Sequence, residues 1–231
     1  MTELTVPLTA GQIAAAIRLH DRLPNWAFSD RTLVALRERM PGFTPEETLV
    51  KTATINALYG TNLFAVVRMA EHVAQVLAET NLASAGPELV EQMAALPMTA
   101  TQKHMHRHMS FAAKFAHFFI DPERFPIMDS YAVWMVEYHL GRKNCLRDAK
   151  QLYMAFVENL RRLREAAELN VKSRELDRYL WLAGQYRQWR KNPKSQINSE
   201  LVAFFAHPSG ESAEELHALA PFAYNGVGGG R

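Results

Sequence analysis

Cysteine is the scarcest residue in this sequence, because Cys145 stands alone among 231 residues. A single cysteine cannot form a disulfide within the chain. It also cannot supply the several thiolates that an iron–sulfur cluster or a cysteine-rich zinc site requires. The sequence therefore excludes a disulfide-stabilised scaffold and these two kinds of metal centre, and we expect neither a cofactor nor a metal ion.

Long apolar runs are missing as well. No stretch reaches the roughly 18 apolar residues that a membrane-spanning helix needs. Met1–Pro7 lacks the basic start and the apolar run of a signal peptide. Hydrophobic residues nevertheless make up 48% of the chain and charged residues 22%, as in ordinary globular proteins. These features predict a soluble, cytoplasmic protein with no membrane partner.

Regular β-type alternation, sequence repeats, phosphate-binding glycine loops and Ser-His-Asp signatures are all absent. Helix signals are dense instead. At Thr44–Glu47 a threonine cap precedes a proline at the first helical position and a glutamate three residues after the cap. We predict an all-α fold, a compact array of short helices. The expected helices cover about residues 9–19, 45–58, 62–79, 86–96, 99–121, 129–140, 146–168, 173–190, 198–206 and 212–219.

No linker divides the chain, so we predict one domain over residues 1–224 with two interleaved helical lobes, acting as a monomer. Residues 225–231 read NGVGGGR, in which four of the seven residues are glycine. Such a composition predicts a flexible tail.

Positive charge is unevenly distributed along the sequence. Residues 142–194 hold 14 Lys/Arg against 6 Asp/Glu, whereas residues 1–99 hold 7 against 10. A basic segment between acidic ones can direct a polyanion to one face of a protein. The alternative is a set of solvated helix faces on which arginine stems cover apolar surface. Within this segment, Arg187, Arg190 and Lys191 are the residues that we expect to contact phosphates.

An unusual lysine lies in the phenylalanine-rich stretch SFAAKFAHFFI, residues 110–120. Almost every residue there is apolar, and a helix that is apolar all round is buried. Lys114 shares one face with Ser110 and His117, and Arg107 continues that stripe. Burial would lower the pKa of Lys114 and favour the neutral, nucleophilic amine. Lys114 is therefore a candidate catalytic nucleophile.

Asp129 is the candidate partner of Lys114. It follows a loop with Pro122 and Pro126 and precedes an expected helix. A carboxylate at a helix start accepts backbone N–H bonds and is held ionised and oriented. Such a group can stabilise positive charge that develops during attack by a lysine. The alternatives are that Asp129 is only a helix cap and that Lys114 reaches the surface without any chemistry.

A lysine on an apolar helix, a short Pro-containing loop and then PIMDSYAVW resemble the helix-hairpin-helix DNA glycosylase superfamily, and most of all its 8-oxoguanine DNA glycosylase branch. The resemblance implies that Lys114 forms a Schiff base with deoxyribose and that Asp129 assists loss of the base. It implies a DNA N-glycosylase, with or without AP lyase activity, that acts on double-stranded DNA with a damaged or modified base. The target nucleotide would be flipped out of the duplex.

A fainter similarity lies at Tyr59-Gly60-Thr61-Asn62, which resembles the family's polar loop beside the extruded base, and it implies that Asn62 contacts DNA. The family's hairpin grips phosphates through a Gly-hydrophobic-Gly turn, but residues 102–109 contain no glycine. Phosphate contacts would come from the side chains of Lys103, Arg107 and His117 instead.

The missing glycine turn favours one alternative, a non-catalytic nucleic-acid-binding or protein-interaction module on the same helical scaffold. A third reading is an enzyme that forms a lysine Schiff base with a small carbonyl compound. An enzyme of that third kind would show a closed apolar pocket without a basic rim.

Overall fold

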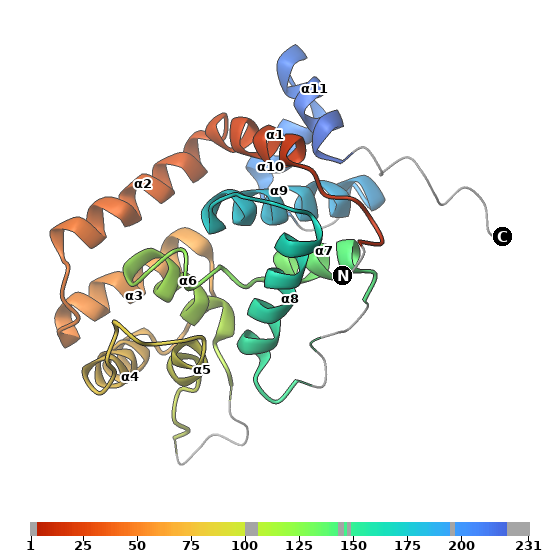
Figure 1. Ribbon diagram of the computed structural model, residues 1–231. Helices are drawn as coiled ribbons and strands as arrows, with labels where there is room; N and C mark the ends of the chain where they lie inside the picture. Colours follow the sequence, from red (N-terminus) through yellow and green to blue (C-terminus); the bar gives the residue numbers. More distant parts are fainter. Residues whose placement is uncertain (1–3, 100–105, 143–145, 147–148, 195–196, 221–231) are drawn as a thin grey trace. The chain divides into compact units, whose positions relative to one another are not determined.

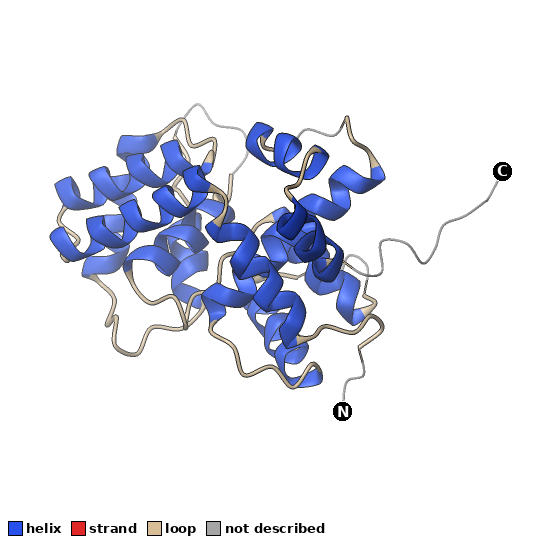
Figure 2. Ribbon diagram, turned by 90° about the horizontal axis from the view of Figure 1, so that it is seen from above, coloured by secondary structure: helices blue, strands red, loops and turns tan. Residues whose placement is uncertain are grey.

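The computed structural model describes residues 4–99, 106–142, 146, 149–194 and 197–220. Within these residues the chain forms eleven helices and no strand, apart from an isolated antiparallel bridge between Ala95 and Arg107. Figure 2 shows helices and loops only in this part of the chain. The all-α prediction is therefore confirmed. None of the described helices has both the length and the continuous hydrophobicity of a membrane span.

The helices are labelled in Figure 1. In chain order they are α1 (Ala10–Asp21), α2 (Pro24–Arg39), α3 (Pro45–Tyr59), α4 (Val66–Ala78), α5 (Glu88–Ala94), α6 (Met109–Phe119), α7 (Ser130–Leu140), α8 (Leu152–Ala166), α9 (Ser173–Lys191), α10 (Ser199–Ala206) and α11 (Gly210–Leu219).

Local capping chemistry sets several helix ends as the sequence predicted. Thr44 and Glu47 form the expected capping box at the start of α3, and Thr9 and Gln12 form another at the start of α1. Asp129 caps α7, and Gly141 ends that helix in the left-handed conformation, with φ of 66°. Glycine adopts this conformation without the steric cost that a Cβ atom brings.

Two predicted helix starts were wrong. The helix expected from residue 99 begins only at Met109. Residues 106–108 are not helical, and the backbone N–H of His108 donates to the carbonyl of Ala94 at 2.9 Å. Residues 100–105 lie outside the described part. The helix expected to be capped by Asn62 begins at Val66, and Asn62 itself has a φ of 53°, which no helix N-cap adopts.

Helix α2 was not predicted at all. It begins at Pro24, and among its sixteen residues only Asp30 and Leu33 are buried. A helix that buries so little shows no apolar stripe in its sequence, so the 3.6-residue periodicity gives no signal.

The chain divides into two compact units, each built from segments that are far apart in the sequence. One unit, here the terminal unit, comprises Met1–Ala27, Asp129–Lys143 and Arg161–Arg231. The other, the central unit, comprises Phe28–Met128 and Asn144–Leu160. Two of the four boundaries fall within helices, in α2 and α8, and the other two lie on either side of α7. The predicted tail, residues 225–231, lies outside the described residues.

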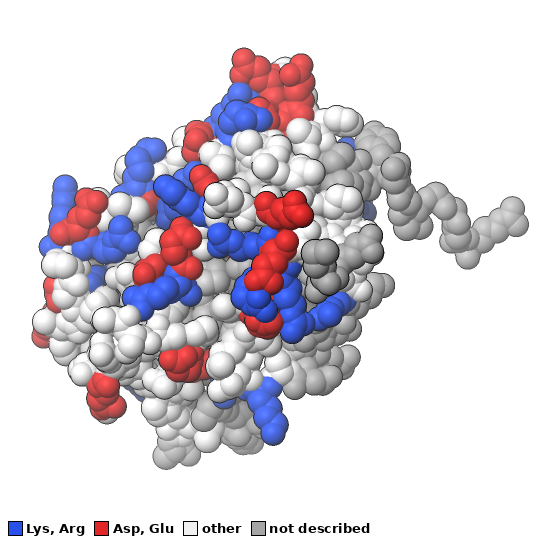
Figure 3. All heavy atoms as spheres, in the orientation of Figure 1, with Lys and Arg blue, Asp and Glu red and all other residues white. Residues whose placement is uncertain are grey.

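In the terminal unit, α9 packs against α1 and α7, and α1 also packs against α11. Trp181 on α9 meets Trp26 at 4.5 Å between ring centroids. Charged pairs join α1 to α11, because Arg22 contacts Glu211 at 2.7 Å and Arg18 contacts Glu215. Figure 3 shows the red acidic side chains gathered at this tip with blue basic ones beside them. These arginines are thus neutralised within the fold.

Gly184 allows the close approach of α9 to α7. A Cβ atom at this position would lie 2.8 Å from the Cβ atom of Tyr131 and 3.2 Å from its carbonyl oxygen. Real Cβ atoms do not approach one another so closely, so any side chain at position 184 would push the two helices apart.

We therefore predict that Gly184→Ala destabilises the terminal unit by about 1–2 kcal/mol, because overpacking outweighs the helix propensity that alanine gains. All four tryptophans of the sequence, at positions 26, 134, 181 and 189, belong to this unit. Urea unfolding followed by tryptophan fluorescence therefore measures the effect. The control is Gly210→Ala, where the added Cβ meets nothing within 4 Å. Equal stability of the two variants would contradict the prediction.

In the central unit, α3 packs on α4 and α6, and α5 packs on α4 and α6. Its core is rich in phenylalanine, and Phe115 lies within 6.2 Å of the rings of Phe43, Phe111 and Phe119. Arg124 ties the loop before α5 to the end of α6 by donating to the carbonyls of Leu82, Ala83 and Ala85.

Candidate functional site

Lys114 lies in the central unit on α6, where only Ser110 among Met109–Phe119 is not buried. Just 5% of the lysine is exposed, and its Nζ atom donates to the Ser110 hydroxyl at 2.6 Å. The helix is buried because nearly all of its residues are apolar, and this draws the lysine inside with it. The predicted burial of Lys114 is thus observed, and Ser110, which was expected only to share its helix face, accepts its hydrogen bond.

His117 was expected to contact phosphate, and its position does not fit that role. Its exposure is 1%, and its Nδ1 atom lies 3.0 Å from the carbonyl oxygen of Phe125. His117 lies three residues after Lys114, so the two side chains share one face of α6, as the spacing predicted. All residues of α6 except Ser110 are buried, however. A buried ring cannot reach a phosphate on the surface, so His117 holds the loop after α6 instead.

Arg107 was also expected to contact phosphate, and it already has a carboxylate partner. Its guanidinium donates to Glu91 on α5 at 2.9 Å, with about half of the arginine side chain exposed. Glu91 is buried and also accepts the backbone N–H of Tyr153 at 2.5 Å. A phosphate would have to compete with this ion pair. Lys103, the third predicted contact in this region, lies outside the described residues.

Asp129 lies in the terminal unit, and its carboxylate accepts the backbone N–H of Ala132 at 2.9 Å. This bond fixes the carboxylate at the first turn of α7, where the helix dipole favours negative charge. Burial raises the pKa of the neighbouring Tyr131 phenol, and the charge of Asp129 adds to that shift. The two predicted catalytic residues thus belong to different units. Lys114 donates to Ser110 in the central unit, and Asp129 accepts from Ala132 in the terminal unit.

The loop that holds Asn62 is exposed and is shaped by Asn56. The Asn56 side chain accepts the backbone N–H of Leu63 at 2.9 Å and donates to the Leu63 carbonyl at 3.1 Å. Asn62 itself is exposed, and Phe64 beside it is 98% exposed. The loop therefore presents one amide and one aromatic side chain to its surroundings.

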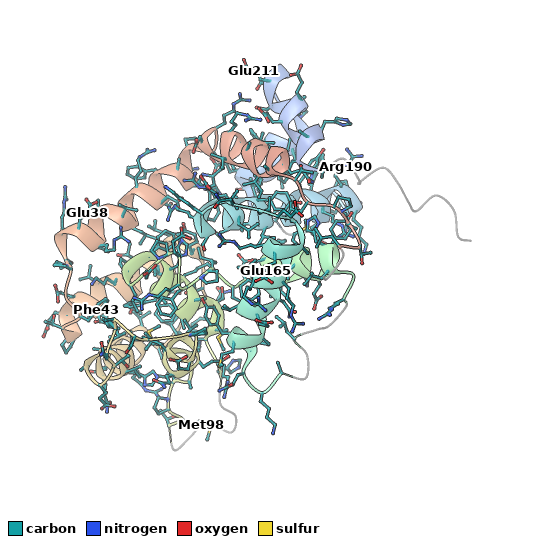
Figure 4. The ribbon with its side chains drawn as sticks, viewed as in Figure 1. Glu38, Phe43, Met98, Glu165, Arg190 and Glu211 are labelled. Carbon is teal, nitrogen blue, oxygen red and sulfur yellow. The ribbon has the colours of Figure 1, made fainter. Side chains whose placement is uncertain are left out.

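Lys51 was missed by sequence reasoning. It is fully buried on α3, its Nζ atom donates to the carbonyl of Gly42, and it lies 4.2 Å from the ring centroid of Phe43, which Figure 4 labels at the start of α3. Burial lowers the pKa of Lys51, and the charge of Glu47 opposes that shift. The sequence signal was the buried face Thr48, Lys51, Thr52 and Ile55, which has helical spacing but is mostly polar.

A pocket of about 280 Å³ lies in the terminal unit between α7 and α9. Two of the predicted phosphate contacts line it together, Arg187 and Lys191. The third, Arg190, lies instead against the ring of Tyr186, near the end of α9 in Figure 4. The remaining lining residues are Trp134, Met135, Gly184 and Gln188.

Comparison with known proteins gives few relatives. A family model named HI_0787_N, which is described as an N-terminal domain, matches residues 12–124. An uncharacterized protein of Haemophilus influenzae is 30% identical over 135 residues, or 56% of this chain and 62% of that protein. The match therefore spans less than two thirds of that relative. No solved structure matches the chain. The family match includes Lys114 and Lys51 and ends before Asp129.

Proposed function

We propose that this protein is a DNA N-glycosylase that excises a damaged or modified base through a Schiff base on Lys114. We also propose that its all-α fold is that of the helix-hairpin-helix DNA glycosylases. The observation that carries the proposal is the burial of the Lys114 amine on α6, with the Ser110 hydroxyl at 2.6 Å as an acceptor. A desolvated lysine is the nucleophile that this chemistry requires, because only the neutral amine attacks carbon.

The proposed reaction needs only the lysine, the DNA and water. The neutral amine of Lys114 forms a bond to C1′ of the deoxyribose while the C1′–N bond breaks and its electron pair leaves with the base. The base takes up one proton as it departs, which balances the proton that the attacking nitrogen gives up. Opening of the sugar ring gives the imine, from which water regenerates the lysine or β-elimination cleaves the strand.

Asp129 has the second role in this proposal. Its carboxylate, fixed by the Ala132 N–H, would stabilise the positive charge that develops on the sugar as the base leaves.

Borohydride trapping tests the proposal. The protein is incubated with duplex DNA that carries an abasic site or 8-oxoguanine, reduced, and separated on a denaturing gel. A covalent protein–DNA band is the expected result, because reduction converts the imine into a stable amine. Measurable binding without a band on either DNA would contradict a lysine nucleophile.

We also predict that Asp129→Asn separates base release from imine formation. Asparagine is an equally good N-cap, so α7 is preserved while the charge is lost. Excision of 8-oxoguanine should slow by about 10²–10⁴-fold, whereas trapping on an abasic site, which has no base to lose, should change little. Equal losses in the two assays would contradict this role of Asp129.

A second candidate is a nucleic-acid-binding module without catalysis. The same scaffold without catalysis could also serve as a protein-interaction module. This alternative is favoured by the missing glycine turn in residues 102–109 and by the pairing of Arg107 with Glu91, because both depart from the family's grip on DNA phosphates. Under this alternative no base is released and no covalent band forms, whether or not Lys114 is replaced.

A further inference from the structure

We propose that the pocket between α7 and α9 binds a nucleotide, with the base stacked on Trp134 and the phosphate held by Arg187 and Lys191. All of these groups belong to the terminal unit, and none has a part in the chemistry proposed for Lys114 and Asp129. This site therefore goes beyond the proposed function and stands or fails independently of it.

Trp134 supplies the stacking surface. It lies on α7 and is 48% exposed, whereas most large apolar side chains of the unit are buried. Tyr131 supports it in an edge-on contact, with ring centroids 5.6 Å apart. A nucleobase is planar and can stack on an exposed indole, which removes apolar surface of both rings from water.

The two cations supply the phosphate site. Arg187 and Lys191 are one turn apart on α9, so they point to the same side of the helix. The Arg187 guanidinium lies 3.6 Å from the centroid of the Tyr138 ring. This contact holds the planar guanidinium in one orientation. No carboxylate among the described residues pairs with either cation, in contrast to Arg18, Arg22, Arg107 and Arg124. Their charge is thus available to an anion.

The remaining lining limits the size of the ligand. Gly184 has no side chain to fill the space beside Met135. A volume of about 280 Å³ lies at the small end of ligand sites, so one nucleotide is favoured over a larger cofactor. The nucleotide can be free or part of a single strand, because both present the same base and phosphate.

The test measures two ligands on the full chain: dAMP by calorimetry and a fluorescein-labelled oligothymidylate of twelve nucleotides by anisotropy. Trp134→Ala should weaken binding by about 5- to 150-fold, whereas Trp134→Phe should retain most of the affinity. Lys191→Ala should weaken binding and lower the salt dependence of oligonucleotide binding by about one phosphate contact. Arg161→Ala is the matched control, because this arginine of the same unit lies outside the pocket and is paired with Glu165, so its loss should leave binding unchanged.

Tight binding of dAMP would support a free nucleotide as the ligand, and binding of the oligonucleotide alone would support a nucleotide within a strand. Three results would overturn the proposal: unchanged affinity in a folded Trp134→Ala variant, inorganic phosphate that competes as well as dAMP, or no binding of either ligand at millimolar concentration. Urea unfolding of each variant, followed by far-UV circular dichroism, shows whether it is folded.

Discussion

Lys114→Met is expected to abolish the covalent protein–DNA band in borohydride trapping, with a loss of at least about 10³-fold, because the substitution removes the amine that forms the imine in the proposed reaction. Methionine has a similar length and is apolar, so it should fit within α6 among the phenylalanines. The Ser110 hydroxyl loses its donor, but it is only half-buried and can bond to water instead. The chain should therefore stay folded while the nucleophile is lost.

Lys51→Met is the matched control for this experiment. Among the described residues of the central unit, Lys51 is the second buried lysine, and it lies on α3 rather than α6. The same substitution removes a buried amine at both sites, so any general effect on packing is shared. Retention of the band in Lys51→Met and its loss in Lys114→Met would assign the nucleophile. The reverse pattern in folded proteins would transfer that role to Lys51.

The stability of the terminal unit is expected to fall as the pH is lowered from about 6.5 to about 4, because His139 resists protonation in the folded state. This histidine is fully buried, and both ring nitrogens have partners: the Val6 carbonyl and the Tyr179 hydroxyl, each at 2.9 Å. Burial lowers the pKa of His139, the hydrogen bond to Val6 opposes that shift, and the charge of Arg187 adds to it, which together bring the pKa to about 4.

The sign follows from proton binding in the two states. In the unfolded chain His139 takes up a proton near pH 6.5, whereas the folded protein takes it up only near pH 4. Between these values the unfolded state binds more protons, so acid favours unfolding, and below about pH 4 the loss is complete. The shift corresponds to about 3 kcal/mol in total, of which about 2 kcal/mol should be lost by pH 5.

Urea unfolding at pH 7.5 and pH 5, followed by tryptophan fluorescence, measures this effect. His139→Gln should be less stable at pH 7.5 but should lose less stability on acidification than the natural protein. His207→Gln removes an exposed histidine of the same unit and should keep the full pH dependence. If His139→Gln and the natural protein lose equal stability between the two pH values, other groups cause the dependence.

The all-α class and many helix ends could be predicted from the sequence, because they depend on residues that are close together in the chain. The Thr44–Glu47 capping box, the Asp129 cap and the Gly141 stop each arise from bonds or backbone angles within one turn. The burial of Lys114 could also be predicted, because its own helix is apolar on every side. These features follow from local chemistry, which a single sequence contains in full.

Tertiary contacts decided the rest. His117 and Lys114 share a helix and a register, yet the loop through Phe125 covers one and Ser110 pairs with the other. Lys51 escaped notice because its cage comes from Phe43, Phe119 and the Gly42 carbonyl, which only folding brings together. The pocket of Trp134, Arg187 and Lys191 likewise needs the close approach at Gly184. Which cations are neutralised and which stay available depends on neighbours distant in the chain, and residue spacing does not determine that.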